Sequence, residues 1–127
     1  MLNLSHKQLE VYKITLLMVK EVYNITKRFP KEEQFVLVTQ LRRAAVSVCS
    51  NLAEGAARKS AREKRRFYEI SRSSLVEIDT QIEISLSLDY IKHEQISKLK
   101  EYTESSFRML SKMITNLESK IPLATTH

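Results

Sequence analysis

The stretch QLRRAAVSVCSNLAEGAARKSARE, residues 40–63, decides the fold because it contains the end of one helix and the start of the next. Apolar residues recur in it at helical spacing as far as Glu54. Gly55 follows, and glycine readily takes the left-handed conformation that ends a helix. Ser60 and Glu63 then have the spacing of a capping box, which starts a helix. The stretch therefore predicts two helices joined by a short turn.

The same periodicity continues on both sides of this turn. Pro30 disfavours helical geometry in the residue before it and suits the start of a second helix, and Ser5 and Gln8 have capping-box spacing near the N-terminus. One glycine and two prolines in 127 residues leave too little turn chemistry for a sheet protein. The sequence predicts an all-α, antiparallel up-down four-helix bundle with helices over residues 5–29, 31–54, 60–88 and 94–120 and a frayed tail at 121–127.

The first and last helices differ in how many apolar faces they carry. The last has a single stripe, made of Ile96, Leu99, Thr103, Phe107, Leu110, Ile114 and Leu117. The first has one stripe of Val11, Ile14, Met18, Val22, Ile25 and Phe29, and a second stripe of Leu9, Tyr12, Leu16, Val19 and Tyr23. Because a bundle buries one broad stripe per helix, the second stripe is predicted to be a subunit interface. The alternative is one very wide core stripe with half-exposed tyrosines.

The charge of the chain is concentrated in one region. Net charge is +6, and residues 42–72 hold nine Lys or Arg against three Glu, whereas the remainder holds twelve of each sign. Such an asymmetry favours a polyanionic partner. The single cysteine has no partner for a disulfide within the chain, and no apolar run approaches the length of a membrane span. A cytoplasmic protein without a membrane partner is expected.

Catalytic and metal-binding patterns are scarce. A lone glycine excludes P-loop and Rossmann turns, which need several glycines. His6, His93 and His127 lie near the termini or in a predicted loop, and the patterns HExxH and ExxH do not occur. Cys49, at the edge of an apolar arc, is interpreted as a small buried hydrophobe, and no serine lies in GxSxG. We expect no enzyme, metal or cofactor.

The strongest local feature is the basic run of residues 58–66, RKSAREKRR, with six basic residues in nine. Cations at a helix N-terminus face the positive end of the helix dipole, so their clustering there hints at an external anion. Arg62, Arg65 and Arg72 fall opposite the predicted core stripe. The residues expected to contact nucleic-acid phosphates are Arg58, Lys59, Arg62, Arg65 and Arg66. The alternative is an ordinary solvated face, and without interleaved aromatics any sequence preference should be weak.

A second polar set lies on the helix before the turn. Arg43, Ser47, Asn51 and Glu54 share one face at spacings of four, four and three, with Arg42 beside them. The spacing favours a structural role, for instance in salt bridges to Glu77 or Asp79, over a binding role.

The ordered motifs of the chain resemble a known family. The segments are FPKEE (29–33), QLRRAA (40–45), SV (47–48) and NLAEG (51–55), followed by Phe67, SLVE (74–77) and LDYI (88–91). They are similar to the bacterial four-helix bundle proteins encoded within intervening sequences of 23S rRNA genes, over about residues 5–118. This chain has Ser71 and Ser73 where the family usually has Ala and Gly. Arg42, Arg43, Asn51, Glu54 and Gly55 match the motif, whereas the run from Arg58 matches only in being basic.

The resemblance implies a cytoplasmic bundle that assembles as a ring, usually a homopentamer, with no established enzymatic activity. It also implies an affinity for nucleic acid, known best from the related accessory variability determinants of diversity-generating retroelements, which work with a reverse transcriptase. The sequence thus favours a non-enzymatic, ring-forming protein that binds RNA or DNA backbone through a basic surface, with a protein partner such as a reverse transcriptase. The alternative function is a structural oligomeric scaffold that binds an acidic protein.

Overall fold

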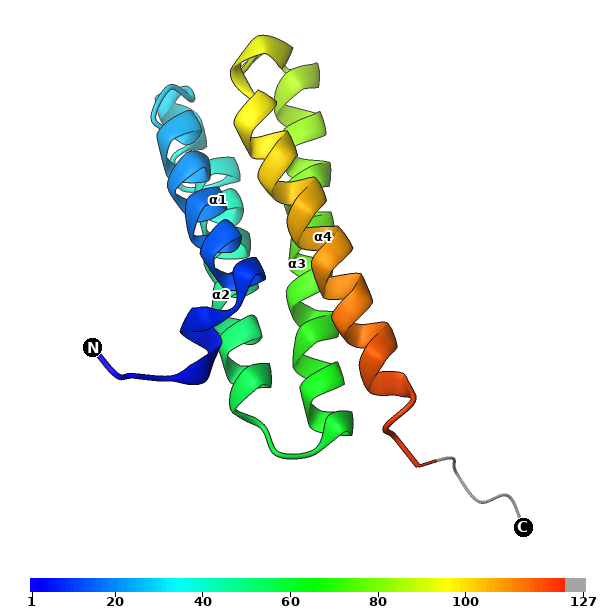
Figure 1. The fold of residues 1–127 in the computed structure, drawn as a ribbon. Coiled ribbons are helices and arrows are strands. Elements are labelled where there is room, and N and C mark those ends of the chain that lie inside the picture. The colour runs from blue at the N-terminus through cyan, green and yellow to red at the C-terminus, as the bar shows by residue number, and fades with distance from the viewer. Residues whose placement is uncertain (123–127) are drawn as a thin grey trace.

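The computed structural model describes residues 1–122 of the chain, and these form four long helices joined by short connections (Figure 1). The helices are α1 (Glu10–Thr26), α2 (Leu37–Ala57), α3 (Ala61–Ser87) and α4 (Ser97–Glu118). Short 3₁₀ turns at Ser5–Gln8, Lys31–Glu33 and His93–Gln95 precede α1, α2 and α4. Residues 1–122 contain no strand, so the predicted all-α four-helix class is confirmed. Of the predicted frayed tail, residues 123–127 lie outside the described part.

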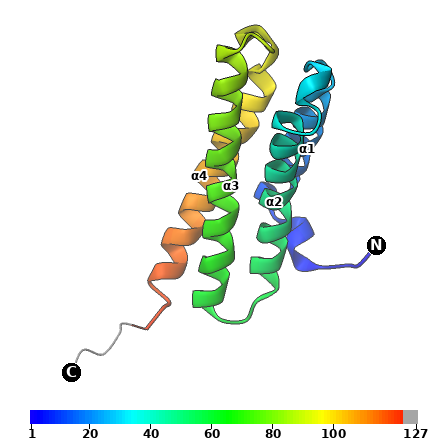
Figure 2. The ribbon, with the colours of Figure 1, turned by 180° about the vertical axis from the view of Figure 1, so that it is seen from behind.

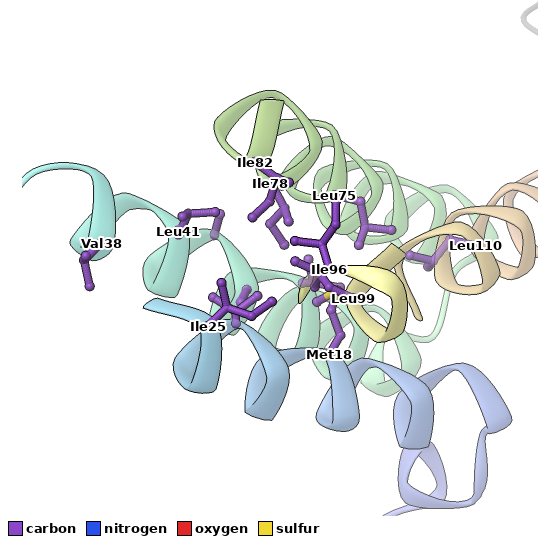
Figure 3. Close-up of a cluster of buried hydrophobic side chains, with 14 of the residues drawn as sticks. Met18, Ile25, Val38, Leu41, Leu75, Ile78, Ile82, Ile96, Leu99 and Leu110 are labelled. Atoms are coloured by element: carbon purple, nitrogen blue, oxygen red, sulfur yellow. The ribbon is translucent and has the colours of Figure 1, made fainter. Parts of the chain in front are cut away.

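The bundle has a square arrangement in which every helix has two neighbours. α1 packs against α2 and α4, and α3 packs against the same two helices. Buried side chains from all four helices meet along the central axis (Figure 3), and Met18, Leu41, Leu75 and Leu110 are each essentially inaccessible to solvent. Burying side chains of this size contributes about 1.5–3 kcal/mol each, so this core accounts for the architecture.

The start and end of α1 and the start of α2 differ from those predicted. Ser5–Gln8 form a 3₁₀ turn without a side-chain cap, and extended Leu9 separates this turn from α1. α1 ends at Thr26, three residues before Phe29, because the chain turns toward Pro30. α2 begins at Leu37 rather than residue 31, since Val36 adopts φ −122° and ψ −91°, which is outside the helical region.

The turn between α2 and α3 is predicted correctly on one side only. The Oγ atom of Ser60 accepts a hydrogen bond from the backbone N–H of Glu63 at 3.1 Å, so Ser60 caps α3 as expected. The prediction that Gly55 ends α2 in a left-handed conformation is wrong, because α2 continues to Ala57 and Gly55 has a negative φ. A Cβ atom at Gly55 would lie 2.6 Å from Cε1 of Tyr68. Glycine is required there by the close approach of α3.

The single stripe of α4 is shifted from its predicted position at one residue. Phe107 is 42% exposed, whereas its neighbour Ser106 is fully buried. The Phe107 ring lies at the edge of the α3–α4 contact, where the guanidinium of Arg72 stands 5.8 Å from its centroid. α4 itself begins at Ser97 rather than residue 94, since His93–Gln95 form a 3₁₀ turn.

The second stripe of α1 divides between the core and the surface. Leu9, Tyr12 and Val19 are partly buried against the hydrophobic core. Leu16 and Tyr23 remain exposed, at 47% and 39% of their accessible surface. The stripe is therefore wide and half-buried within one chain, and its use as a subunit interface stays a prediction.

Candidate nucleic-acid interface

The predicted basic residues surround the turn that joins α2 to α3. Arg58 follows the last residue of α2, Lys59 and Ser60 form the turn, and Arg62, Arg65 and Arg66 lie in the first turns of α3. Ser60 starts α3 here because its side chain satisfies a free N–H at the helix end. The turn is visible at the lower end of the bundle in Figure 1.

Two of the cations at this turn are occupied by contacts within the chain. Nη2 of Arg58 lies 3.1 Å from Oε2 of Glu54, and its guanidinium stands 4.8 Å from the centroid of the Phe67 ring. Nζ of Lys64 donates a hydrogen bond to the carbonyl oxygen of Ala56 at 2.9 Å. Both side chains thus connect the end of α2 to the start of α3.

Three arginines of the run line one hollow beside α2. Arg62, Arg65 and Arg66 line a volume of about 600 Å³, together with the carboxylates of Glu69 and Glu77 and with Ser47 of α2 and Ser74 of α3. Arg65 is partly neutralised, because its Nε atom lies 3.1 Å from Oε1 of Glu69. Arg62 and Arg66 form no ion pair within residues 1–122. The predicted phosphate-binding residues therefore divide into Arg58, which has a structural contact, Lys59, which is exposed in the turn, and the three arginines of α3, which line a common space.

Arg72 is placed differently from its prediction. The sequence predicts that it projects outward with Arg62 and Arg65. Its Nη1 atom instead donates a hydrogen bond to Oγ of Ser111 at 3.1 Å, and its guanidinium lies beside the ring of Phe107. Arg72 bridges α3 and α4 because its position falls at the edge of their contact.

The polar face of α2 forms a hydrogen-bonded floor rather than a ladder of salt bridges. Nδ2 of Asn51 donates to the carbonyl oxygen of Ser47 at 2.9 Å and to its Oγ at 3.0 Å. Oγ of Ser74 donates to Oγ of Ser47, also at 3.0 Å. The expected ion pairs of Arg43 with Glu77 or Asp79 are absent from the described residues, because Arg43 points to solvent.

Arg43 instead borders a second hollow, which continues the first. This hollow has a volume of about 350 Å³ and shares Ser47, Ser74 and Glu77 with the hollow beside Arg62. Sequence reasoning predicted Arg62 and Arg66 for this surface, missed Ser73 and assigned Glu77 to a salt bridge, although the signal for all four was present. The α3 residues that line it, Arg62, Arg66, Ser73 and Glu77, are spaced by four, seven and four, which places them on one helical face.

Arg42, next to Arg43, belongs to the contact between α1 and α2. Its Nε atom donates a hydrogen bond to Oγ1 of Thr26 at 2.9 Å. Its guanidinium stands 4.5 Å from the centroid of the Tyr23 ring, a geometry typical of a cation–π contact. The two adjacent arginines therefore have different surroundings, one packed and one free.

The remaining reactive groups do not converge on this surface. Burial raises the pKa of the Cys49 thiol, and a hydrogen bond with Thr15 acts in the opposite direction to a smaller extent. A raised pKa disfavours the nucleophilic thiolate. Within residues 1–122, no three His, Cys, Asp or Glu side chains are grouped so that they could hold a metal ion. None of the four helices is long and apolar enough to cross a membrane.

Comparison with known proteins gives matches of two kinds. A family model described as 23S rRNA-intervening sequence protein matches residues 7–112. A crystal structure of a protein of unknown function from the S23 ribosomal protein family of Bacteroides thetaiotaomicron is similar in fold, with a TM-score of 0.75. The two chains are 20% identical, and the alignment covers 82% of this chain and 97% of that one. Among curated proteins, no significant match is found.

Proposed function

Since the chain belongs to the 23S rRNA-intervening sequence protein family, we propose that it is a non-enzymatic, ring-forming oligomer that binds the phosphate backbone of nucleic acid through the arginines at the start of α3. The observation that carries the proposal is the convergence of Arg62, Arg65 and Arg66 on one hollow. Guanidinium groups bind phosphate oxygens through paired hydrogen bonds. Two of them, Arg62 and Arg66, form no ion pair within residues 1–122 and lie beside one space, which suits a phosphodiester chain better than isolated surface cations do.

The charge distribution supports the same proposal. Residues 42–72 carry the whole excess of positive charge in the chain. A ring of five copies would present about +30, and binding that releases counterions from several phosphates at once becomes tight even when each contact is weak. A partner that supplies enzymatic activity, such as a reverse transcriptase, remains compatible with this role.

The proposal is tested by replacing both Arg62 and Arg65 with Glu. The double variant should bind RNA and duplex DNA of unrelated sequences more weakly than the wild type, because phosphate contacts carry no sequence information. Each lost contact should also flatten the plot of log affinity against log salt by about 0.7–0.9. A gel shift at several salt concentrations measures both quantities.

The matched control changes the same amount of charge elsewhere. Lys100 and Lys112 are exposed on α4, away from the hollow, so the double variant with Glu at both positions should keep most of the affinity. Equal losses of affinity in the two double variants would mean that net charge alone, and not the position of the arginines, explains the weaker binding. If the arginine variant binds as the wild type does, with an unchanged salt slope, the basic surface would instead serve an acidic protein.

A further inference from the structure

The two hollows between α2 and α3 share Ser47, Ser74 and Glu77, so they form one groove, with arginines at both ends and the Glu77 carboxylate between them. We propose that this groove binds a single strand of nucleic acid, with phosphates at the arginines and a base beside Glu77, and that it prefers bases with an exocyclic amino group. The inference rests on the proposed function and specifies its ligand. The α2–α3 groove is the surface lined by Arg62, Arg66, Ser47, Ser74, Glu77 and Arg43.

The lining of the α2–α3 groove favours a single strand over a duplex. α2 and α3 run side by side for most of their length (Figure 2), and the groove is an open surface hollow along their contact. Ile70 and Glu77 can meet the face and the edge of an unpaired base, whereas a duplex keeps its base faces stacked. Along α3 the groove extends from Arg62 to Gln81, which at 1.5 Å per residue is about 28 Å. That length accommodates several nucleotides of an extended strand.

The floor of the groove offers a hydrogen-bond donor. Oγ of Ser47 accepts from Asn51, and the Ser74 hydroxyl has both Oγ of Ser47 and the carbonyl oxygen of Ile70 as acceptors, so the pair of hydroxyls can offer one hydrogen to a ligand. A phosphate or ribose oxygen held by Arg62 or Arg66 can accept it. Ile70, an exposed apolar residue, lines the same segment and offers a surface for the face of a base.

The middle of the groove, around Glu77, is unsuited to phosphate, whereas Arg43 lies in the hollow beyond it. Glu77 is exposed and forms no ion pair within residues 1–122, and its carboxylate repels a phosphodiester. The same carboxylate accepts hydrogen bonds from amino groups, as acidic residues do with N4 of cytosine. Gln40 and Gln81, joined by a hydrogen bond of 3.3 Å, continue the polar surface. Uracil and thymine carry no amino group, so they should bind less well than cytosine.

The experiment compares cytidine and uridine homo-oligomers of about twelve nucleotides, a length within the range bound by single-strand binding proteins. Fluorescence anisotropy of the full chain is measured with both oligomers as RNA and as DNA, and with a mixed-sequence duplex of similar length. The cytidine oligomer should bind about five- to tenfold more tightly than the uridine oligomer, and both more tightly than the duplex. The RNA and DNA arms show which sugar the groove accepts.

Substitutions in and outside the groove test whether Glu77 causes the preference for cytidine. Glu77→Gln removes the charge but keeps the shape, so the affinity for the uridine oligomer should rise and the ratio between the two oligomers should approach one. Glu83→Gln, an exposed carboxylate on α3 outside the groove, is the matched control and should leave the ratio unchanged. Ser47→Ala should weaken both oligomers by a similar factor.

The outcomes separate this inference from the function on which it rests. Equal affinity for the two oligomers, a ratio unchanged in Glu77→Gln, or duplex bound as tightly as single strand would overturn the groove assignment while leaving backbone binding intact. No binding to any of the oligomers or the duplex would overturn both.

Discussion

Gly55 sets the distance between α2 and α3 at the end of the groove. Its hydrogen occupies a place where a Cβ atom would lie within 3 Å of two ring carbons of Tyr68, and the Tyr68 ring is buried. In most helices glycine costs about 1 kcal/mol relative to alanine. Its presence inside α2 therefore reflects packing between helices and not the end of a helix.

Gly55→Ala should consequently destabilise the protein in spite of the better helix propensity of alanine. Crowding against Tyr68 costs about 1–3 kcal/mol, which exceeds the gain in propensity, so urea denaturation should show a net loss of about 0.5–2 kcal/mol. Ser50→Ala, at an exposed position of α2, is the control that changes propensity alone. Combining Gly55→Ala with Tyr68→Leu should cost less than the two changes added, and additive losses would contradict the packing explanation.

The adjacent residues Arg42 and Arg43 should contribute differently to the free energy of unfolding. Arg42→Ala removes the hydrogen bond to Thr26 and the contact with Tyr23, and should lower the free energy of unfolding by about 1–2 kcal/mol. Arg43→Ala should change it by less than about 0.5 kcal/mol, because Arg43 is exposed and has no ion-pair partner in the described residues. Thermal denaturation of the two variants gives this comparison, and a larger loss in Arg43→Ala would mean that its side chain packs in solution.

At the scale of the helices, the sequence predicts those helix ends that are set by residues close together in the chain. The cap of α3 follows from Ser60 and Glu63, which are three residues apart and need no other part of the chain. The starts of α1 and α2 were predicted less well, since 3₁₀ turns use the same residue types as helices. Extended Leu9 separates the first turn from α1, and residues 34–36, of which Val36 lies outside the helical region, separate the second turn from α2.

For the candidate site, too, the sequence predicts what depends on neighbouring residues and not what depends on the packing of helices. The basic run is contiguous, so its location at the start of a helix could be inferred directly from the sequence. Its division into Arg58, which packs on Phe67, and Arg62 and Arg66, which face the groove, depends on how α2 and α3 pack. Arg72 was misplaced for the same reason, because its partner Ser111 lies on α4, 39 residues away.

At the scale of the whole molecule, α1 carries the surface predicted for self-association. Leu16 is exposed on its outer face, next to Leu17, which is also exposed. Replacing Leu16 and Val19 by Lys should lower the assembled mass measured by light scattering and leave the helical circular dichroism signal largely intact. Because Val19 also touches the core, Leu16→Lys alone provides a second test.

The control for this experiment is Ile84→Lys, which adds a charge at an exposed apolar position of α3. It should leave the assembled mass unchanged. A wild-type protein that is monomeric at micromolar concentration would remove both the interface and the ring from the proposed function.

The α2–α3 groove is built from one contiguous segment, residues 40–81, whose two helices are joined by the three residues Arg58, Lys59 and Ser60. Contacts between neighbouring helices of a hairpin close short loops and form early in folding, whereas the contact of α1 with α4 joins the two ends of the chain. α1 pairs with its own neighbour in sequence, α2, through the same kind of short connection. The surface for binding and the surface for assembly therefore each depend on one local hairpin that includes α2, and the α1–α4 contact closes the bundle around both.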